Sequence, residues 1–109
     1  MATRANIVID QGAAFSAEIN VTDDNDDIVD LSGYTANAQM KKWYTSSNSV
    51  TFSTAISAEE GLVTISLTTA QTGDIEFGRY VYDVIIHDAN NVSTKIVEGI
   101  ATVTPTVTL

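Results

Sequence analysis

Positions 78–87 read Gly78-Arg79-Tyr80-Val81-Tyr82-Asp83-Val84-Ile85-Ile86-His87, and this stretch decides the fold. Successive side chains of an extended chain point to opposite faces, so this stretch has two different sides. One side is wholly apolar or aromatic and consists of Tyr80, Tyr82, Val84 and Ile86. The other side mixes charged residues with aliphatic ones. The pattern predicts a central strand with one face in a core and the other partly covered.

The residues just before this strand, Asp74-Ile75-Glu76-Phe77-Gly78, predict a turn, and Tyr80 follows the glycine by two positions. This arrangement resembles the tyrosine corner of β-sandwiches, in which a Tyr hydroxyl donates a hydrogen bond to nearby backbone. Tyr82 stands where antibody domains carry the second cysteine of their disulfide. The sequence therefore predicts a sandwich without that crosslink.

Alternation of apolar and polar residues predicts further strands on both sides of this one. We expect them at residues 4–10, 15–22, 35–44, 50–56, 62–68 and 92–103, with one helical turn at 69–72 and Pro105 ending the last strand. The fold class expected is all-β, an antiparallel Ig-like β-sandwich of roughly seven to eight strands, with a small barrel as the alternative. The predicted core contains Phe15, Ile65, Tyr80, Tyr82, Val84 and Ile86.

Length and composition restrict the possible classes of protein. The 109 residues fit one domain over positions 1–109, and a hydrophobic fraction of 44% is ordinary for a globular chain. No apolar run approaches the roughly 20 residues that cross a bilayer, and the N-terminus lacks the apolar segment of a secretion signal. The absence of cysteine excludes disulfides and thiolate chemistry. The net charge of −9 predicts that the chain repels nucleic acid and anionic membranes.

The acidic segment Asp23–Asp27 is the candidate metal site. Asp23, Asn25 and Asp27 are spaced as at the start of a calcium loop, and Asp30 follows closely. The glycine that such a loop needs would fall at Ile28, however, and no Glu closes the loop. Asp and Asn also favour turns, so we interpret the segment as a solvated turn and predict no metal and no cofactor.

No residue pattern in the sequence indicates catalysis. His87 is the one histidine, and Asp88 beside it points to the opposite face of a strand, so we expect an exposed histidine at a strand end. Glu59 and Glu60 precede a glycine and are typical of a charged hairpin tip. No glycine-rich phosphate loop occurs. We therefore expect no enzymatic activity.

Trp43 and Tyr44 form the one aromatic pair that the sequence places at a loop edge. Such a pair binds a sugar ring or a partner in some proteins, and packs where a strand leaves its sheet in others. Lys41 and Lys42 lie beside it and are two of the five basic residues. An acidic copy of the same chain could therefore dock at this corner.

Several runs occur together in an order that resembles a known family. They are Gln11-Gly12-Ala13-Ala14-Phe15, Val21-Thr22-Asp23-Asp24-Asn25-Asp26, Asp30-Leu31-Ser32-Gly33-Tyr34-Thr35-Ala36, Gln39-Met40-Lys41-Lys42 and Gly78-Arg79-Tyr80-Val81-Tyr82-Asp83-Val84. The set resembles the N-terminal β-sandwich domain of phage baseplate upper proteins and virion structural proteins of T4-like cyanophages. The resemblance implies a virion component rather than an enzyme.

Three kinds of function follow as expectations. The first is a bacteriophage virion structural protein, a non-catalytic interaction module on the tail or baseplate-neck region, assembled in the host cytoplasm. The second is a capsid decoration protein, and the third is a free carbohydrate- or calcium-binding module. The partners expected are other phage structural proteins or copies of this chain in a symmetric array. The first strand and the segment 103–109 carry few charges, so either could add a strand to a neighbour's sheet.

Overall fold

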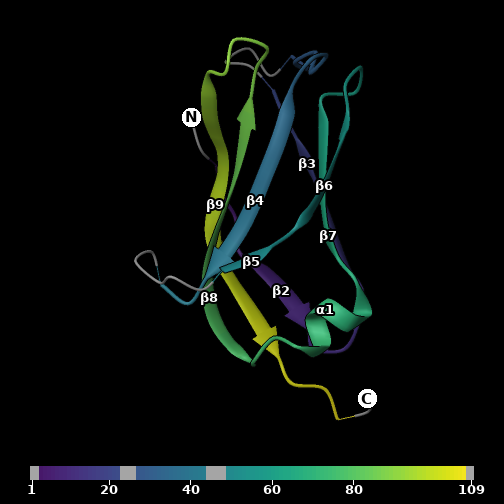
Figure 1. Cartoon of the computed structure of the whole chain (residues 1–109), viewed down its shortest axis with the longest axis vertical. Helices are drawn as coiled ribbons and strands as arrows, with labels where there is room; N and C mark the ends of the chain where they lie inside the picture. Colours follow the sequence, from purple (N-terminus) through teal and green to yellow (C-terminus); the bar gives the residue numbers. More distant parts are fainter. Residues whose placement is uncertain (1–2, 23–26, 44–48, 108–109) are drawn as a thin grey trace.

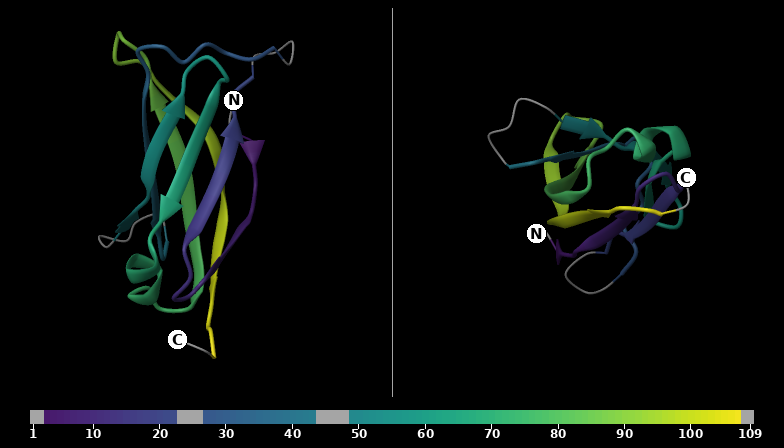
Figure 2. Two further views of the ribbon diagram at one scale, coloured as in Figure 1. Left: turned by 90° about the vertical axis from the view of Figure 1, so that its right-hand side faces the viewer. Right: turned by 90° about the horizontal axis from the view of Figure 1, so that it is seen from below.

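The computed structural model describes residues 3–22, 27–43 and 49–107, and these form two layers of strands with one short helix (Figures 1 and 2). The strands are β1 (Thr3–Arg4), β2 (Ile7–Asp10), β3 (Phe15–Asn20), β4 (Thr35–Lys41), β5 (Ser49–Thr51), β6 (Ser53–Ser57), β7 (Leu62–Leu67), β8 (Gly78–His87) and β9 (Ser93–Thr104), and the helix is α1 (Thr69–Gly73). The all-β sandwich expected from the sequence is confirmed.

The strands pair into two sheets. The first, sheet A, has the order β1-β9-β8-β4-β5, with β2 also on β9, and the second, sheet B, has the order β3-β7-β6. The central strand predicted at 78–87 is β8, which lies between β9 and β4. Most pairs are antiparallel, but β1 and β2 run parallel to β9, which a purely antiparallel sandwich does not include. The reason is that β3 continues the chain in the other sheet, so no hairpin joins β2 to its neighbour.

The prediction of one strand over residues 50–56 is wrong. This segment is divided between β5 in sheet A and β6 in sheet B. Phe52 lies at the crossing, where its amide donates to the carbonyl oxygen of Ala38 over 2.9 Å and its side chain is buried. The hydroxyl of Thr54 then donates to the carbonyl oxygen of Ala36 over 3.0 Å. Alternation does not reveal such a switch, because an inward-facing residue remains inward in both sheets.

The inner faces of the two sheets form one core. Four of the predicted core residues, Ile65, Tyr82, Val84 and Ile86, are buried, while Phe15 and Tyr80 are partly buried and pack against them. The aromatic rings bridge the layers: Phe15 and Phe52 have centroids 5.9 Å apart, and Phe52 meets Tyr82 edge-on at 6.5 Å. Edge-on contacts of this kind are favourable beyond the area they bury.

Two sets of side-chain hydrogen bonds order the chain just before β8. Thr68 caps α1, since its hydroxyl accepts from the Gln71 amide and the Gln71 side chain accepts from the Thr68 amide. The hydroxyl of Tyr80 donates to the carbonyl oxygen of Glu76 over 2.8 Å, which confirms the tyrosine corner. These hydrogen bonds fix the direction in which the chain enters β8.

The edge of sheet A is fastened to β8 by Tyr82. Its hydroxyl donates to the carbonyl oxygen of Ala5, in the break between β1 and β2, over 2.6 Å. A Cβ at Gly99 would overlap that same oxygen, so only glycine lets the chain pass so close to β9. Asn6 completes the crossing by accepting from the Ile100 amide over 3.1 Å. Desolvation raises the pKa of the Tyr82 phenol, as expected for a buried hydroxyl.

Tyr82→Ala should lower the stability of the fold more than Tyr82→Phe does. We expect Tyr82→Ala to lower the free energy of unfolding by about 3–5 kcal/mol because it leaves a cavity among aromatic rings. Tyr82→Phe keeps the ring and should cost about 1–3 kcal/mol, because the Ala5 carbonyl loses its donor. Urea unfolding followed by fluorescence and circular dichroism measures both. Equal losses for the two variants would contradict this assignment of the ring and the hydroxyl.

Candidate interaction surfaces

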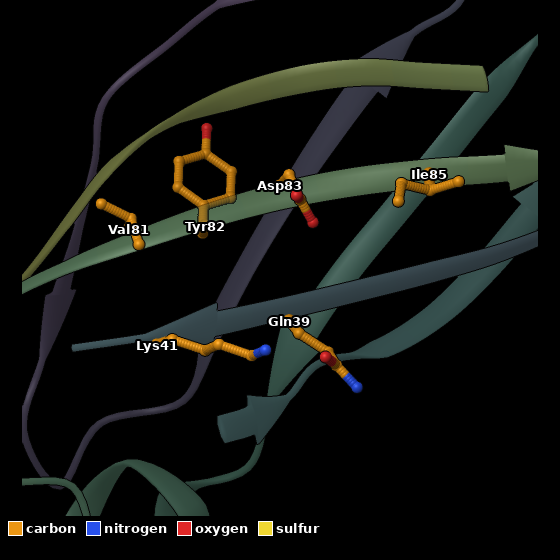
Figure 3. Close-up of a pocket in the computed structure, with 6 residues that line it drawn as sticks. All are labelled: Gln39, Lys41, Val81, Tyr82, Asp83 and Ile85. Carbon is orange, nitrogen blue, oxygen red and sulfur yellow. The ribbon is translucent and has the colours of Figure 1, made fainter. Parts of the chain in front are cut away.

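The outward side of sheet A combines charged, polar and aliphatic side chains. Its central strands alternate inward and outward, so Val81, Asp83 and Ile85 of β8 face out beside Gln39 and Lys41 of β4. Together with Tyr82 these residues line a shallow hollow of about 230 Å³ (Figure 3). We call this side, from β2 across to β5, the outer face of sheet A.

Charge is unevenly divided between this face and the rest of the chain. Because register and alternation place them there, the outer face carries seven charged residues: Arg4, Lys41, Arg79, Lys95, Asp10, Asp83 and Glu98. Four cations and three anions give the face a net charge of +1. Because the whole chain has a net charge of −9, the residues outside this face have a net charge of −10. The outer face is thus the part of an acidic protein that an acidic neighbour approaches with least repulsion.

Only part of that charge is neutralised within the face. Glu98 pairs with Lys95 at 3.0 Å and with Arg4 at 3.4 Å. The Lys95 hydrogen bond and charge, with a smaller effect of Arg4, lower the pKa of the Glu98 carboxyl. Lys41, Arg79 and Asp83, by contrast, make no ion pair with any described residue. Both signs of charge are therefore available to a partner.

Aliphatic side chains lie among these charges. Val81, Ile85 and Ile100 are half-buried on the outer face, and Val8 on β2 is 63% exposed. Lys41, Val81 and Ile100 are in register across β4, β8 and β9. Many protein interfaces likewise combine aliphatic side chains with charges of both signs.

His87 ends β8 as expected, but it is partly buried rather than exposed, and its ring lies in a polar cluster. Its Nδ1 lies 2.7 Å from the Ser93 hydroxyl and its Nε2 lies 3.0 Å from the Asn37 amide nitrogen. With that amide donating to Nε2, the ring proton is on Nδ1 and the serine hydroxyl accepts it. Asp88 does not join the cluster, because its carboxylate accepts from the amides of Asn90 and Val92 in the hairpin turn. The cluster ties β4, β8 and β9 together at the end of the sheet.

The other acidic candidates lie apart. Glu59 and Glu60 are exposed in the turn between β6 and β7, as expected of a hairpin tip. The Asp30 carboxylate accepts from the Ser32 amide at 2.9 Å and the Ser32 hydroxyl at 2.7 Å, and these hydrogen bonds lower its pKa. Asp23 and Asn25 lie outside the described residues. Within residues 3–22, 27–43 and 49–107 no three His, Asp or Glu side chains gather as a metal site would require.

Calcium binding is the direct test of the turn interpretation. We expect calorimetric titration with CaCl₂ to give no saturable heat, because Ile28 replaces the glycine of a calcium loop and Ser32 already engages Asp30. A micromolar site that disappears in Asp27→Ala, and persists in the control Glu59→Ala, would contradict the prediction.

The corner expected around Trp43 is a groove in the structure. Trp43 is 59% exposed, and Tyr44 lies outside the described residues. The Lys42 ammonium is 4.9 Å from the centre of the Tyr80 ring, a cation–π contact. A groove of about 560 Å³ opens there, lined by Met40, Lys42, Trp43, Ser49, Val50, Asp74, Ile75, Glu76 and Tyr80. The sequence indicated the aromatic residue, but not the carboxylates that the α1–β8 turn brings to it.

No helix among the described residues is long and apolar enough to cross a membrane. No protein-family model matches the chain, and no curated protein matches it. Among solved structures, a Listeria monocytogenes internalin-like protein resembles it over 96% of this chain, with a TM-score of 0.48 and 15% sequence identity. This chain spans 28% of the length of that protein. At that degree of likeness the comparison carries no argument about function.

Proposed function

We propose that this chain is a virion structural protein of a tailed bacteriophage, a non-catalytic β-sandwich module that binds other structural proteins or copies of itself. The observation that carries the interaction role is the outer face of sheet A, which is nearly neutral on a chain of net charge −9 and carries aliphatic side chains among its charges. The virion context rests on the resemblance of the runs at residues 11–15, 21–26, 30–36, 39–42 and 78–84 to phage baseplate and cyanophage structural proteins. We place the module on the tail or baseplate-neck region.

The face favours a protein partner over other classes. Nucleic acid needs a surplus of Lys and Arg to neutralise phosphates, and this face has a surplus of one. The same reasoning disfavours an anionic membrane surface. A protein partner needs apolar area with charges of both signs at its margin, which Val81, Ile85 and the neighbouring Lys41 and Asp83 supply.

Strand edges offer a second mode of attachment within the same proposal. β2 pairs with β9 on one side only, and β3 ends sheet B, so each has an edge that pairs with no described strand. Past Pro105, Val107 is fully exposed in the tail at the end of the molecule where α1 lies (Figure 1). Addition of this tail to a neighbour's edge strand would bind through main-chain hydrogen bonds.

Location in a purified particle tests the proposed function. We expect immunogold labelling and mass spectrometry of purified virions to find the protein in the particle, and electron microscopy to place it at the tail. A regular pattern on the capsomers would favour the decoration role instead. Recovery solely as free protein in the lysate would refute the virion role.

Incorporation into particles should depend on the outer face. Val81→Glu places a carboxylate in the hollow beside Asp83, so we expect at least about a tenfold loss of incorporation, the effect of about 1.4 kcal/mol in binding. Val92→Glu is the control, since Val92 is 58% exposed in the hairpin between β8 and β9, away from the hollow. Both variants are checked for unchanged unfolding temperature. Equal incorporation of the two would show that the outer face is not the contact.

A further inference from the structure

We infer that the groove beside Trp43 is a binding site for a neutral sugar ring, independent of the contact proposed for the outer face. The groove lies where the end of β4 and the start of β5 meet the turn between α1 and β8. Its volume of about 560 Å³ is within the range of small-molecule sites. Nothing in the proposed assembly role requires such a groove.

Trp43 supplies the apolar surface of the site. At 59% exposed, its indole is open to solvent at the groove, and among the seven aromatic residues that the structure describes Phe77 alone is similarly exposed. The apolar face of a pyranose packs on an exposed indole in the same way as other amphipathic rings. The hydroxyls of a sugar also need hydrogen-bond acceptors. The exposed carboxylates of Asp74 and Glu76 supply them.

The groove is built on fixed backbone. The hydroxyl of Tyr80 is bonded to the Glu76 carbonyl over 2.8 Å, which holds the turn that carries both carboxylates. Lys42 lies 4.9 Å from the Tyr80 ring centre, and a Cβ at Gly78 would come within 2.6 Å of its ammonium. Gly78 therefore leaves the space into which the Lys42 side chain folds. These contacts hold the Glu76 backbone and the Lys42 side chain in place before a ligand binds, which lowers the entropic cost of binding.

Charge determines the class of ligand. The Lys42 ammonium already occupies the cation position over Tyr80, so a quaternary ammonium would meet a like charge there. Asp74 and Glu76, on a chain of net charge −9, repel an anionic sugar. A neutral ring with many hydroxyls is the ligand that both constraints allow.

Trp43 is the single tryptophan of the chain, so its emission reports on this groove alone. The experiment titrates the full chain with maltohexaose, cellohexaose, chitohexaose and mannohexaose, and with oligogalacturonate and choline as charged probes. We expect a saturable change of Trp43 emission with at least one neutral oligosaccharide, at a dissociation constant on the order of 1 mM or tighter. No saturable change with any of the four, or tighter binding of either charged probe, would overturn the inference.

Variants that retain Trp43 distinguish the contribution of the groove residues to binding from that of their neighbours. Asp74→Asn with Glu76→Gln should weaken the binding about tenfold, because two charged acceptors are lost while the indole stays. Phe77→Ala is the matched control: Phe77 is 62% exposed and neighbours Glu76, but does not line the groove. Equal weakening in both variants would overturn the inference, and so would retention of binding in Trp43→Ala by calorimetry. Loss of particle incorporation without loss of sugar binding would count against the assembly role alone.

Discussion

The hydrogen bond from the Tyr82 hydroxyl to the Ala5 carbonyl joins the centre of sheet A to its edge. A buried phenol that lacked an acceptor would be costly, so the edge strand must pass over this ring. Gly99 makes that passage possible because it has no Cβ to displace the same carbonyl. The Tyr82 ring also meets Phe52, which meets Phe15 of sheet B. One side chain thereby connects the edge, the middle of one sheet and the opposite sheet.

Tyr82 makes this connection in a chain that has no cysteine to crosslink its sheets. A disulfide acts largely on the unfolded chain, whereas an aromatic contact acts on the folded one. No disulfide therefore links the stability of this chain to the redox state of its surroundings. The consequence for the surface is geometric. Because Tyr82 and Val84 point into the core, the adjacent Val81 and Asp83 point outward, so the packing of the core positions the hollow of the outer face.

The sequence predicted those features that depend on one strand at a time. Alternation located β8 and its buried side, and the spacing of Gly78 and Tyr80 indicated the corner that Tyr80 makes with Glu76. It did not predict features that depend on how strands pair. Arg79 and Lys41 could each be assigned an outward side, but their gathering with Arg4 and Lys95 follows from register.

The same distinction explains the errors and omissions. The sheet switch at Phe52 preserves the inward position of that residue, so the periodicity of residues 50–56 did not reveal it. Parallel pairing of β2 with β9 joins residues about as far apart as the chain permits, and a local pattern contains no signal for it. The Trp43 groove depends on the α1–β8 turn, which lies distant in sequence from the end of β4.

The division of charge bears on how an acidic chain can assemble at all. Most of the described acidic residues outside this face lie in the turns that join the strands, namely Asp30, Glu59, Glu60, Asp74, Glu76 and Asp88. A neighbour on the outer face of sheet A therefore meets a local charge near zero, and exposed charges farther from it than the Debye length of about 8 Å are largely screened. Local neutrality removes repulsion but supplies little attraction, since exposed ion pairs contribute weakly. The attraction must then come from apolar burial, so Val81 and Ile85 should matter more to a contact on this face than Lys41 and Arg79.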